Sequence, residues 1–458
     1  MPDFRIRAGV WTALGVVTSL YVTSGVSGQA QQVPSRPNIV VFLTDDQGYG
    51  DLASFGHPTI RTPNIDRMAQ EGLRLTSFYA APSCTPSRAQ FLTGRYSVRS
   101  GELTPTGPGS PVGLPQKEIT IAEALKAQGY RTGMVGKWHL GDFATHPEFN
   151  PMSHGFDFFF GLPYSHDYRP PFVQNASPVP LYRGLQEIER PVDAFTLTQR
   201  YTQEALRFIR ESNRGPFFLY IAYNMPHLPV GVPATFQGRS RAGRYGDAIE
   251  EIDWSVGQVL DALKASNVDR NTVTVFFSDN GPWANAEPRS FQETQTLWDV
   301  GWAGLLRGTK GTTWEGGVRV PAIVRWPEGI PGGRVSADMV SELDLFPTFV
   351  HAAGARMPDD RTMDGYDLLP LLRGEGSSAR HELFYLLGAV PEAVRIDAWK
   401  LRLASPAGRA GVAGSAVTTP ELYDLDRDPG ERFDVAKDYP EVVERLRMRL
   451  NGFEASLR

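Results

Sequence analysis

Residues 39–43, IVVFL, form a continuous apolar run, and residues 44–51, TDDQGYGD, follow it directly. Such a run is typical of a strand that is buried on both faces of a mainly parallel sheet. The two aspartates come after the run, so they would lie at the carboxyl end of this strand. They need a turned backbone to face one ion, and we expect the glycines of the QGYG segment, residues 47–50, to supply that freedom.

Helices and further apolar strands alternate along the chain after this first strand. In order, the sequence predicts a helix that starts around residues 62–66 with Thr62 as its cap, a helix at 119–128, a strand at 133–135, a helix at 195–209, a strand at 217–222, a helix at 248–263 and a strand at 273–277. This alternation predicts an α/β fold with a large, mainly parallel or mixed central sheet that is flanked by helices.

The composition changes at residues 373–380, RGEGSSAR, which indicates a boundary. Beyond it, the runs 383–386 and 400–403 suggest a small antiparallel sheet, and residues 441–453 suggest a last helix. We therefore predict a catalytic domain of residues 31–375 and a smaller C-terminal subdomain of residues 376–458. Two long segments rich in glycine, proline and aromatic residues, 143–191 and 282–313, are typical of loops that build or cover sites.

The N-terminus and the overall charge limit the possible partners and location. Arg5 and Arg7 precede an apolar stretch, and small residues at 28–30 offer a cleavage site, so we predict a signal peptide at residues 1–30 and no membrane span after its removal. The net charge of −5 provides no global basic field for nucleic acid. Cys84 is the only cysteine, so no intramolecular disulfide can form.

Polar residues follow four of the predicted strands. The pairs, in chain order, are Asp45 with Asp46, Lys137 with His139, Asn224 with His227, and Asp279 with Asn280. Ligands of open α/β sheets lie outside the carboxyl ends of the strands, so these groups would converge in one crevice. The carboxylates and the Asn280 amide form a hard oxygen set that suits calcium or magnesium.

Cations and proton carriers accompany these oxygen ligands. Arg88 offers a planar fork for oxyanions, whereas Lys137 and Lys310 are point charges on flexible stems. His139 and His227 can exchange a proton near neutral pH. Taken together, these side chains are suited to the hydrolysis of a charged ester.

Residues 82–88, PSCTPSR, contain Cys84 and lead into a helix. A lone cysteine can simply be a small buried hydrophobe. The stretch, however, resembles the sulfatase signature Cys-x-Pro-Ser-Arg, whose cysteine a modifying enzyme oxidises to formylglycine. If the resemblance holds, Cys84 is a precursor and the working residue is an aldehyde.

The resemblance to sulfatases extends over most of the chain, from about residue 37 to the final helix. The matching blocks are TDDQGYGD (44–51), TGRY (93–96), GKWHLG (136–141), SDNG (278–281) and KGTTWEGGVRVP (310–321). Within the family, the arylsulfatase A group is most similar, through HGFD (154–157), GLPYSHD (161–167), GLLRGTK (304–310), LYDL (422–425) and DPGE (428–431). The resemblance implies an alkaline phosphatase-like fold and an arylsulfatase-type enzyme that releases sulfate and an alcohol or phenol.

The same resemblance implies a role for each site residue. The implied metal ligands are Asp45, Asp46, Asp279, Asn280 and an oxygen of the modified Cys84, and calcium is favoured over magnesium. The implied sulfate ligands are Lys137, Ser165, His227 and Lys310. Arg88 would position the geminal diol of hydrated formylglycine, one hydroxyl of which attacks sulfur. His227 or Lys310 would assist the leaving oxygen, and His139 would take the proton of the second hydroxyl as sulfate is expelled.

The implied partners are a sulfated small molecule or carbohydrate as substrate and a formylglycine-generating enzyme during maturation. Relatives from animals are cross-linked by several disulfides, which this chain cannot make. Its single cysteine therefore favours a bacterial exported enzyme, periplasmic or extracellular, over an animal lysosomal one.

Three other functions are compatible with parts of the sequence. A phosphonate or phosphate ester hydrolase of the alkaline phosphatase superfamily would share the fold and the anion site. A carbohydrate-binding or scaffold protein would keep the fold without activity. A thiol hydrolase would use unmodified Cys84 with a histidine as base, although that scheme gives no place to Pro86 and Arg88.

Overall fold

The computed structural model describes residues 36–170, 172–174, 176–212, 214–286, 291, 295–403 and 419–457. The predicted signal peptide, residues 1–30, lies outside the described residues. In the part that is described, none of the helices combines the length and the apolar character needed to cross a membrane.

The large sheet is mixed and has eleven strands in the described part of the chain. Its strands are β1 (Asn38–Thr44), β2 (Leu73–Tyr79), β3 (Arg131–Lys137), β4 (Phe158–Leu162), β5 (Leu181–Arg183), β6 (Gln186–Glu189), β7 (Phe217–Ala222), β8 (Thr272–Ser278), β9 (Arg319–Arg325), β10 (Arg334–Ser336) and β11 (Val340–Ser341). They lie in the order β10-β2-β9-β8-β1-β7-β3-β4-β5-β6, with β11 paired to β2. The neighbours β8, β1, β7, β3 and β4 are all parallel, whereas β9 is antiparallel to both β8 and β2. The predicted mainly parallel or mixed sheet is confirmed.

Strand β1 occupies the middle of the sheet, between β7 and β8, and all seven of its residues are buried. Its side chains alternate between two apolar cores. Ile39, Val41 and Leu43 belong to one, and Val40 and Phe42 belong to the other. A strand between two covered faces needs apolar residues in succession, which explains why residues 39–43 contain no polar side chain.

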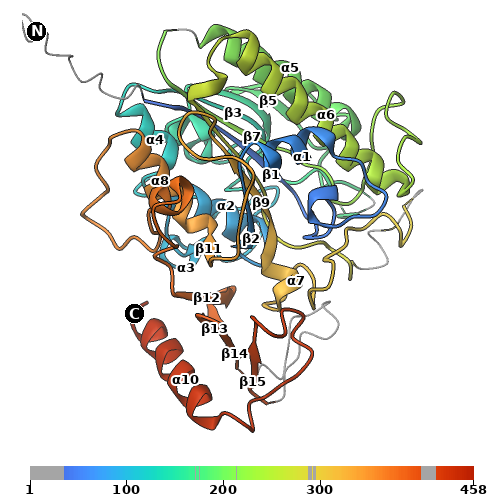
Figure 1. The fold of residues 1–458 in the computed structure, drawn as a ribbon. Coiled ribbons are helices and arrows are strands. Elements are labelled where there is room, and N and C mark those ends of the chain that lie inside the picture. The colour runs from blue at the N-terminus through green and yellow to red at the C-terminus, as the bar shows by residue number, and fades with distance from the viewer. Residues whose placement is uncertain are drawn as a thin grey trace, which may run out of the picture. The chain divides into compact units, whose positions relative to one another are not determined.

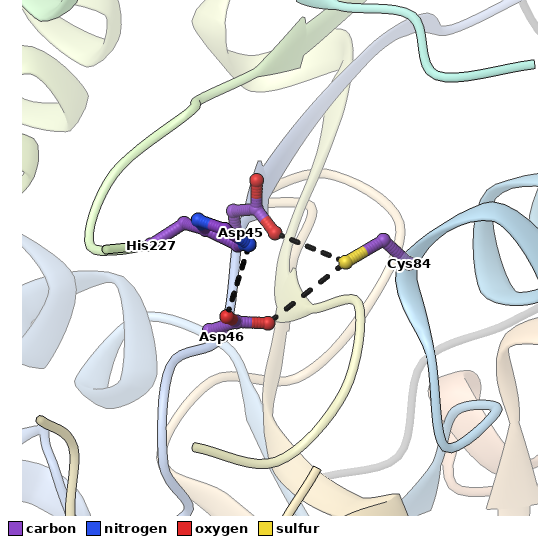
Figure 2. A group of neighbouring side chains, drawn as sticks. All are labelled: Asp45, Asp46, Cys84 and His227. Carbon is purple, nitrogen blue, oxygen red and sulfur yellow. Dashed lines mark hydrogen bonds and ion pairs between the residues drawn. The ribbon is translucent and has the colours of Figure 1, made fainter. Parts of the chain in front are cut away.

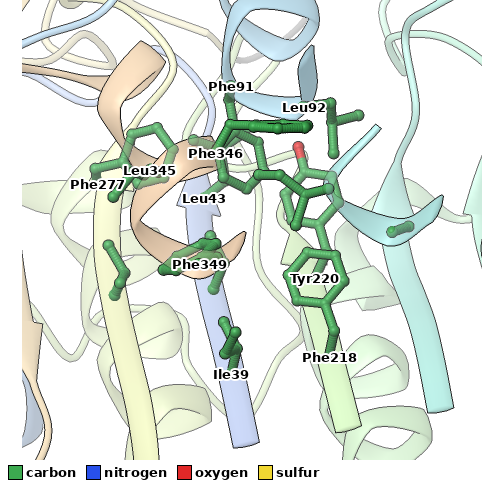
Figure 3. Close-up of a cluster of buried hydrophobic side chains, with 14 of the residues drawn as sticks. Ile39, Leu43, Phe91, Leu92, Phe218, Tyr220, Phe277, Leu345, Phe346 and Phe349 are labelled. Atoms are coloured by element: carbon green, nitrogen blue, oxygen red, sulfur yellow. The ribbon is translucent and has the colours of Figure 1, made fainter. Parts of the chain in front are cut away.

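Helices cover both faces of the sheet (Figure 1). They are α1 (Pro63–Gln70), α2 (Cys84–Thr93), α3 (Ser97–Ser100), α4 (Ile121–Lys126), α5 (Leu197–Glu211), α6 (Gly243–Ala265), α7 (Glu315–Val318), α8 (Leu345–Ala352) and α9 (Leu369–Arg373). Short 3-10 helices lie at Ala53–Phe55, Pro147–Phe149, Pro151–His154, Ala194–Thr196, Asp269–Asn271 and Glu342–Asp344. Helices α2, α4 and α8 contribute to one core, and α1, α5 and α6 contribute to the other. Figure 3 shows Phe91 of α2 and Phe346 of α8 packed over the central strands.

Several predicted elements differ from the structure at their ends or in their detail. Thr62 occupies the N-cap position of α1, but its side chain makes no capping bond and donates to Asp66 instead, at 3.1 Å. Strand β9 was not predicted, and Pro321 in its middle argues locally against a strand. In the structure Pro321 falls where the register of the β2–β9 pair shifts, so the strand tolerates it.

The C-terminal part forms a second, four-stranded antiparallel sheet, as predicted. It consists of β12 (Glu382–Leu387), β13 (Val390–Ile396), β14 (Trp399–Arg402) and β15 (Glu421–Asp424), and the last helix is α10 (Pro440–Ala455). Leu446, Leu450 and Phe453 of α10 join a third apolar core with residues of this sheet. The ring of Phe453 stacks on that of Phe384, with 4.1 Å between centroids.

A buried ion cluster joins the C-terminal sheet to the main part of the structure. The Nζ atom of Lys400, on β14, lies 2.8 Å from Glu315 of α7 and 2.9 Å from Glu431. All three side chains are fully buried. Burial alone would raise the pKa of Glu315, but Lys400 and nearby arginines outweigh it and hold that pKa at about 2. Helix α7 follows the segment that carries Lys310, so this cluster helps to fix that segment.

We predict that Lys400→Met strongly destabilises the protein. Removing one partner of a buried ion pair leaves uncompensated charge, which costs about 3–5 kcal/mol. The free energy of unfolding, measured by urea denaturation at pH 7, should fall by that amount. Arg449→Met is the matched control, because Arg449 is 56% exposed in its pair with Glu382 and its loss should cost about 1 kcal/mol or less. Equal effects of the two substitutions would contradict the prediction.

Candidate active site

The carboxyl ends of four adjacent strands bring the predicted site residues together. The strands lie in the order β8-β1-β7-β3. Asp45 and Asp46 follow β1, Lys137 ends β3, and Asp279 follows β8. His227 comes from the segment after β7. Figure 2 shows Asp45, Asp46, Cys84 and His227 around one point, and one potential ligand atom from each lies within 4.8 Å of the others.

The backbone turn after β1 points both aspartates into this cluster. Asp46 has a φ of 64°, in the left-handed region that few residues other than glycine adopt. Its backbone N–H donates to Asp279 Oδ1 at 3.2 Å. We predicted that glycines would supply the turn, but the turning residue is Asp46 itself. Gly48 instead lets the backbone at Trp302 approach closely, since a Cβ at residue 48 would lie 2.4 Å from the carbonyl oxygen of Trp302.

Cys84 is the first residue of α2 and is 1% exposed. Its thiol donates to Asp45 Oδ1 at 3.4 Å, and it accepts from Lys310 Nζ at 3.3 Å. Burial, reinforced by the charge of Asp279, raises the pKa of the thiol well above its usual value. Because the thiolate is the nucleophilic form of cysteine, this environment disfavours the thiol-hydrolase alternative.

Each of the three aspartates of the site, Asp45, Asp46 and Asp279, has a cation as its partner. Lys137 forms a close ion pair with Asp45, and Lys310 Nζ lies 2.7 Å from Asp46 Oδ1. Arg88, fully buried, donates to Asp279 Oδ2 at 2.7 Å and to the carbonyl oxygen of Lys137 at 2.9 Å.

The net pKa shifts of Asp45 and Asp279 are opposite in direction, although cations lower the pKa of both. Burial would raise the pKa of Asp45, but Lys137, His227 and Arg88 outweigh it and hold that pKa well below the usual range. Burial and the charge of Asp45 raise the pKa of Asp279 to about 6, despite the opposing effect of Arg88. The buried carboxylates therefore repel one another, and the neighbouring cations offset that repulsion.

The two histidines are held differently. His227 Nδ1 lies 2.5 Å from the carbonyl oxygen of Leu228, which can only accept, so Nδ1 carries the proton. Its Nε2 lies 3.4 Å from Asp46 Oδ2.

His139 has a φ of 60°, and its carbonyl oxygen accepts from the hydroxyl of Thr85 at 2.7 Å. Both ring nitrogens of His139 are buried without a hydrogen-bond partner among the described residues. Burial, followed by Lys137 and Arg88, lowers the pKa of His139 well below its usual value, which keeps the ring neutral.

The oxygen atoms of the site fit a hard divalent cation. Asp45, Asp46 and Asp279 offer carboxylates that are at most 2% exposed. Asn280 donates through Nδ2 to Asp46 Oδ1 at 2.7 Å, and its Oδ1 is buried without a partner in the described part of the structure. An orphaned amide oxygen beside three crowded carboxylates is the arrangement that a hard cation would satisfy.

Ser165 lies in a segment that packs against His227. It is 1% exposed and directly precedes His166, whose ring packs against that of His227 with 5.7 Å between centroids. The structure thus brings the 165–167 block against His227.

The sequence did not predict a role for two supporting residues, Asp51 and Thr106. Asp51 accepts from the backbone N–H groups of Gly48 and Trp302 and from the Tyr245 hydroxyl, at 2.6–2.8 Å, so it clamps the turn after β1. The signal available for Asp51 was its place inside the 44–51 block. Thr106 donates to the same His139 carbonyl as Thr85, at 3.3 Å. Threonines are too common in loops for such a role to be recognised from sequence.

Comparisons with known proteins relate most of the chain to one family. The family model described as Sulfatase matches residues 37–355, and the one described as N-sulphoglucosamine sulphohydrolase, C-terminal, matches residues 309–403. Arylsulfatase A from Homo sapiens is 41% identical over 461 residues, which cover 91% of this chain and 87% of that protein. N-acetylgalactosamine-6-sulfatase from Canis lupus familiaris is 39% identical over 471 residues, which cover 93% and 87%. The crystal structure of a sulfatase from Pseudoalteromonas sp. has a TM-score of 0.81 and 29% identity, covering 92% of this chain and 90% of that chain.

We predict that Arg88→Met destabilises the protein when divalent cations are absent. The loss of Arg88 leaves Asp279 without its cation inside a buried cluster, which should lower the free energy of unfolding by about 3–5 kcal/mol. Arg88→Lys keeps the charge but not the forked geometry, so it should cost less. Arg427→Met is the control, because Arg427 is 83% exposed in its ion pair with Asp424. Urea unfolding in a chelating buffer measures all three, and wild-type stability in Arg88→Met would refute the pairing argument.

Proposed function

Because this chain belongs to the sulfatase family and hydrolyses sulfate esters, releasing sulfate and an alcohol or phenol, we propose that the cluster around Cys84 is its active site. The observation that carries the proposal is the position of Cys84 Sγ, 3.4 Å from Asp45 and 3.3 Å from Lys310 Nζ inside a buried set of charges. We propose that Cys84 is converted to formylglycine by a formylglycine-generating enzyme before the protein acts.

The proposed cofactor is a calcium ion, with magnesium as the second choice. It would be held by Asp45, Asp46, Asp279, Asn280 and an oxygen on the modified Cys84. The orphaned Oδ1 of Asn280 and the crowding of the three carboxylates support this set. When bound, the ion would supply positive charge beside the sulfate group.

Hydrated formylglycine would supply a hydroxyl nucleophile and a second hydroxyl that lets sulfate leave from within the site. Arg88 would orient this group, since it already bridges Asp279 and the carbonyl oxygen of Lys137 at the base of the cluster. His139 would accept a proton, and its two unpartnered ring nitrogens within the described structure support that role.

The remaining polar side chains would bind the sulfate group. We assign this role to Lys137, Ser165, His227 and Lys310. Lys310 and His227 both reach Asp46, from different segments, which supports a shared task at the leaving oxygen. Cations in a water-poor site stabilise developing negative charge more strongly than they would in water.

We also propose the domain division and the location. The separate antiparallel sheet that starts at Glu382 supports a C-terminal subdomain of residues 376–458 beside a catalytic domain of residues 31–375. Export to the periplasm or the extracellular space of a bacterium rests on the signal-peptide pattern of residues 1–30 and the single cysteine. The substrate would be a sulfated small molecule or carbohydrate.

Mass spectrometry of the peptide that contains Cys84 tests the modification. In protein made together with a formylglycine-generating enzyme, we expect the mass of an aldehyde in place of the thiol, and its amount should rise in proportion to activity on 4-nitrophenyl sulfate. Cys84→Ala should abolish turnover, because no nucleophile remains. Fully active protein whose Cys84 is entirely thiol would rule out the proposed mechanism. Faster turnover of an aryl phosphonate than of the aryl sulfate would favour the phosphonate-hydrolase alternative.

Thermal unfolding with and without metal tests the cation site. A ligand that binds only the folded state at 100 times its Kd stabilises that state by about 2.7 kcal/mol. Calcium should therefore raise the Tm of the wild type, and magnesium at equal concentration should raise it less. Asn280→Ala should lose most of this rise. The control is Asp253→Asn, a buried aspartate that bonds Asn64 and Ile65 away from the cluster, and it should keep the full rise. An undiminished rise in Asn280→Ala would exclude Asn280 as a ligand.

A further inference from the structure

Trp283 lies directly against two of the side chains of the site. It follows Asn280 by three residues, on the loop that leaves β8. Its ring lies 5.2 Å from the ring of His227, and Lys310 Nζ lies 4.9 Å from its ring centroid. The side chain is partly exposed, so its indole borders the buried cluster on one side and solvent on the other.

The loop around Trp283 is tied to the segment that carries Lys310. The carbonyl oxygen of Pro282 accepts from the backbone N–H of Lys310 at 2.9 Å and also from the Thr309 hydroxyl. The backbone N–H of Ala284 donates to the same Thr309 hydroxyl at 3.0 Å. Trp283 is therefore bracketed on both sides by bonds to residues 309 and 310, and its place beside Lys310 is set before any substrate arrives.

This placement puts Trp283 where the alcohol part of the substrate would bind. Lys310 and His227 are the groups that we assign to the leaving oxygen, so the alcohol bonded to that oxygen must lie next to them. An indole presents a large, rigid apolar face at little cost in conformational entropy. A flat substrate ring can stack on such a face, whereas a short alkyl chain gains little from it.

We propose that Trp283 is a specificity-determining residue that contacts the ring of the alcohol, and that the substrates are sulfate esters whose sulfated oxygen is on or next to such a ring. This inference rests on the proposed function, because it takes Lys310 and His227 as the leaving-group end of the site. The chemistry it requires is an apolar ring face, which both an aryl group and a pyranose sugar offer.

A purely structural role for Trp283 makes a different prediction. The cation–π contact holds Lys310, so removal of the ring could weaken catalysis by misplacing the ammonium group. That loss would fall equally on every sulfate ester, with or without a ring. A loss confined to ring-bearing substrates separates direct contact from positioning.

The experiment measures kcat and KM of formylglycine-containing wild type, Trp283→Phe and Trp283→Ala on 4-nitrophenyl sulfate, galactose 6-sulfate and ethyl sulfate. For Trp283→Ala we expect a three- to tenfold higher KM on at least one ring-bearing substrate, the size of one lost aromatic contact. Its KM for ethyl sulfate and its inhibition by inorganic sulfate should stay within about twofold of the wild type, because neither offers a ring for the indole to contact and Lys310 keeps its ion pair with Asp46. Trp283→Phe keeps a ring and should show a smaller effect. Trp298→Ala, which removes a side chain that is 85% exposed on the same loop, should match the wild type.

The outcomes separate the possible failures. A rise in KM on the aryl ester alone or on the sugar ester alone supports the proposal and identifies the source of the ring. An equal loss on all three esters, or no loss on any, would overturn it. Wild-type protein that carries formylglycine but releases no sulfate from any of the three would overturn the proposed function, and this inference with it.

Discussion

Three buried carboxylates, Asp45, Asp46 and Asp279, act on one another through their charges, and the site depends on how that charge is balanced. Isolated buried charges are costly, so Asp45, Asp46 and Asp279 each need a positive partner. Lys137, Lys310 and Arg88 supply one partner each. In the proposed reaction the two lysines also bind the sulfate group, and Arg88 orients the hydrated formylglycine.

The cations come from three different parts of the chain, and the fold must deliver each of them. Lys137 ends a strand, and Arg88 lies on the helix that Cys84 begins. Lys310 lies in a long connection between β8 and α7, and its segment is held by bonds to Pro282 and by the buried cluster of Lys400 with Glu315. The C-terminal sheet thus supports the site, and none of the site residues named above comes from the part of that sheet that the structure describes. At the proposed leaving-group end of the site, Trp283 on the long loop after β8 contacts His227 and Lys310.

Much of the fold was predictable because it follows from local patterns. The strands β1, β7 and β8 were recognised as short apolar runs, and their parallel arrangement followed from the helices between them. Strand β9 was not recognised, because Pro321 conflicts with a strand locally and only pairing on both sides overrides it. The small strands inside residues 143–191 carry too few residues for a periodic signal.

The sequence by itself determined that Asp45, Lys137, His227 and Asp279 lie close together, because polar groups placed after neighbouring parallel strands meet at one edge of the sheet. It also determined the family, through blocks of consecutive residues. Only the tertiary structure decided how these groups face one another: the left-handed turn at Asp46, the clamp by Asp51, and the contact of Trp283 with Lys310 and His227. The physical reason is that strand periodicity is a local property, whereas each of these three features depends on segments that lie far apart in the chain.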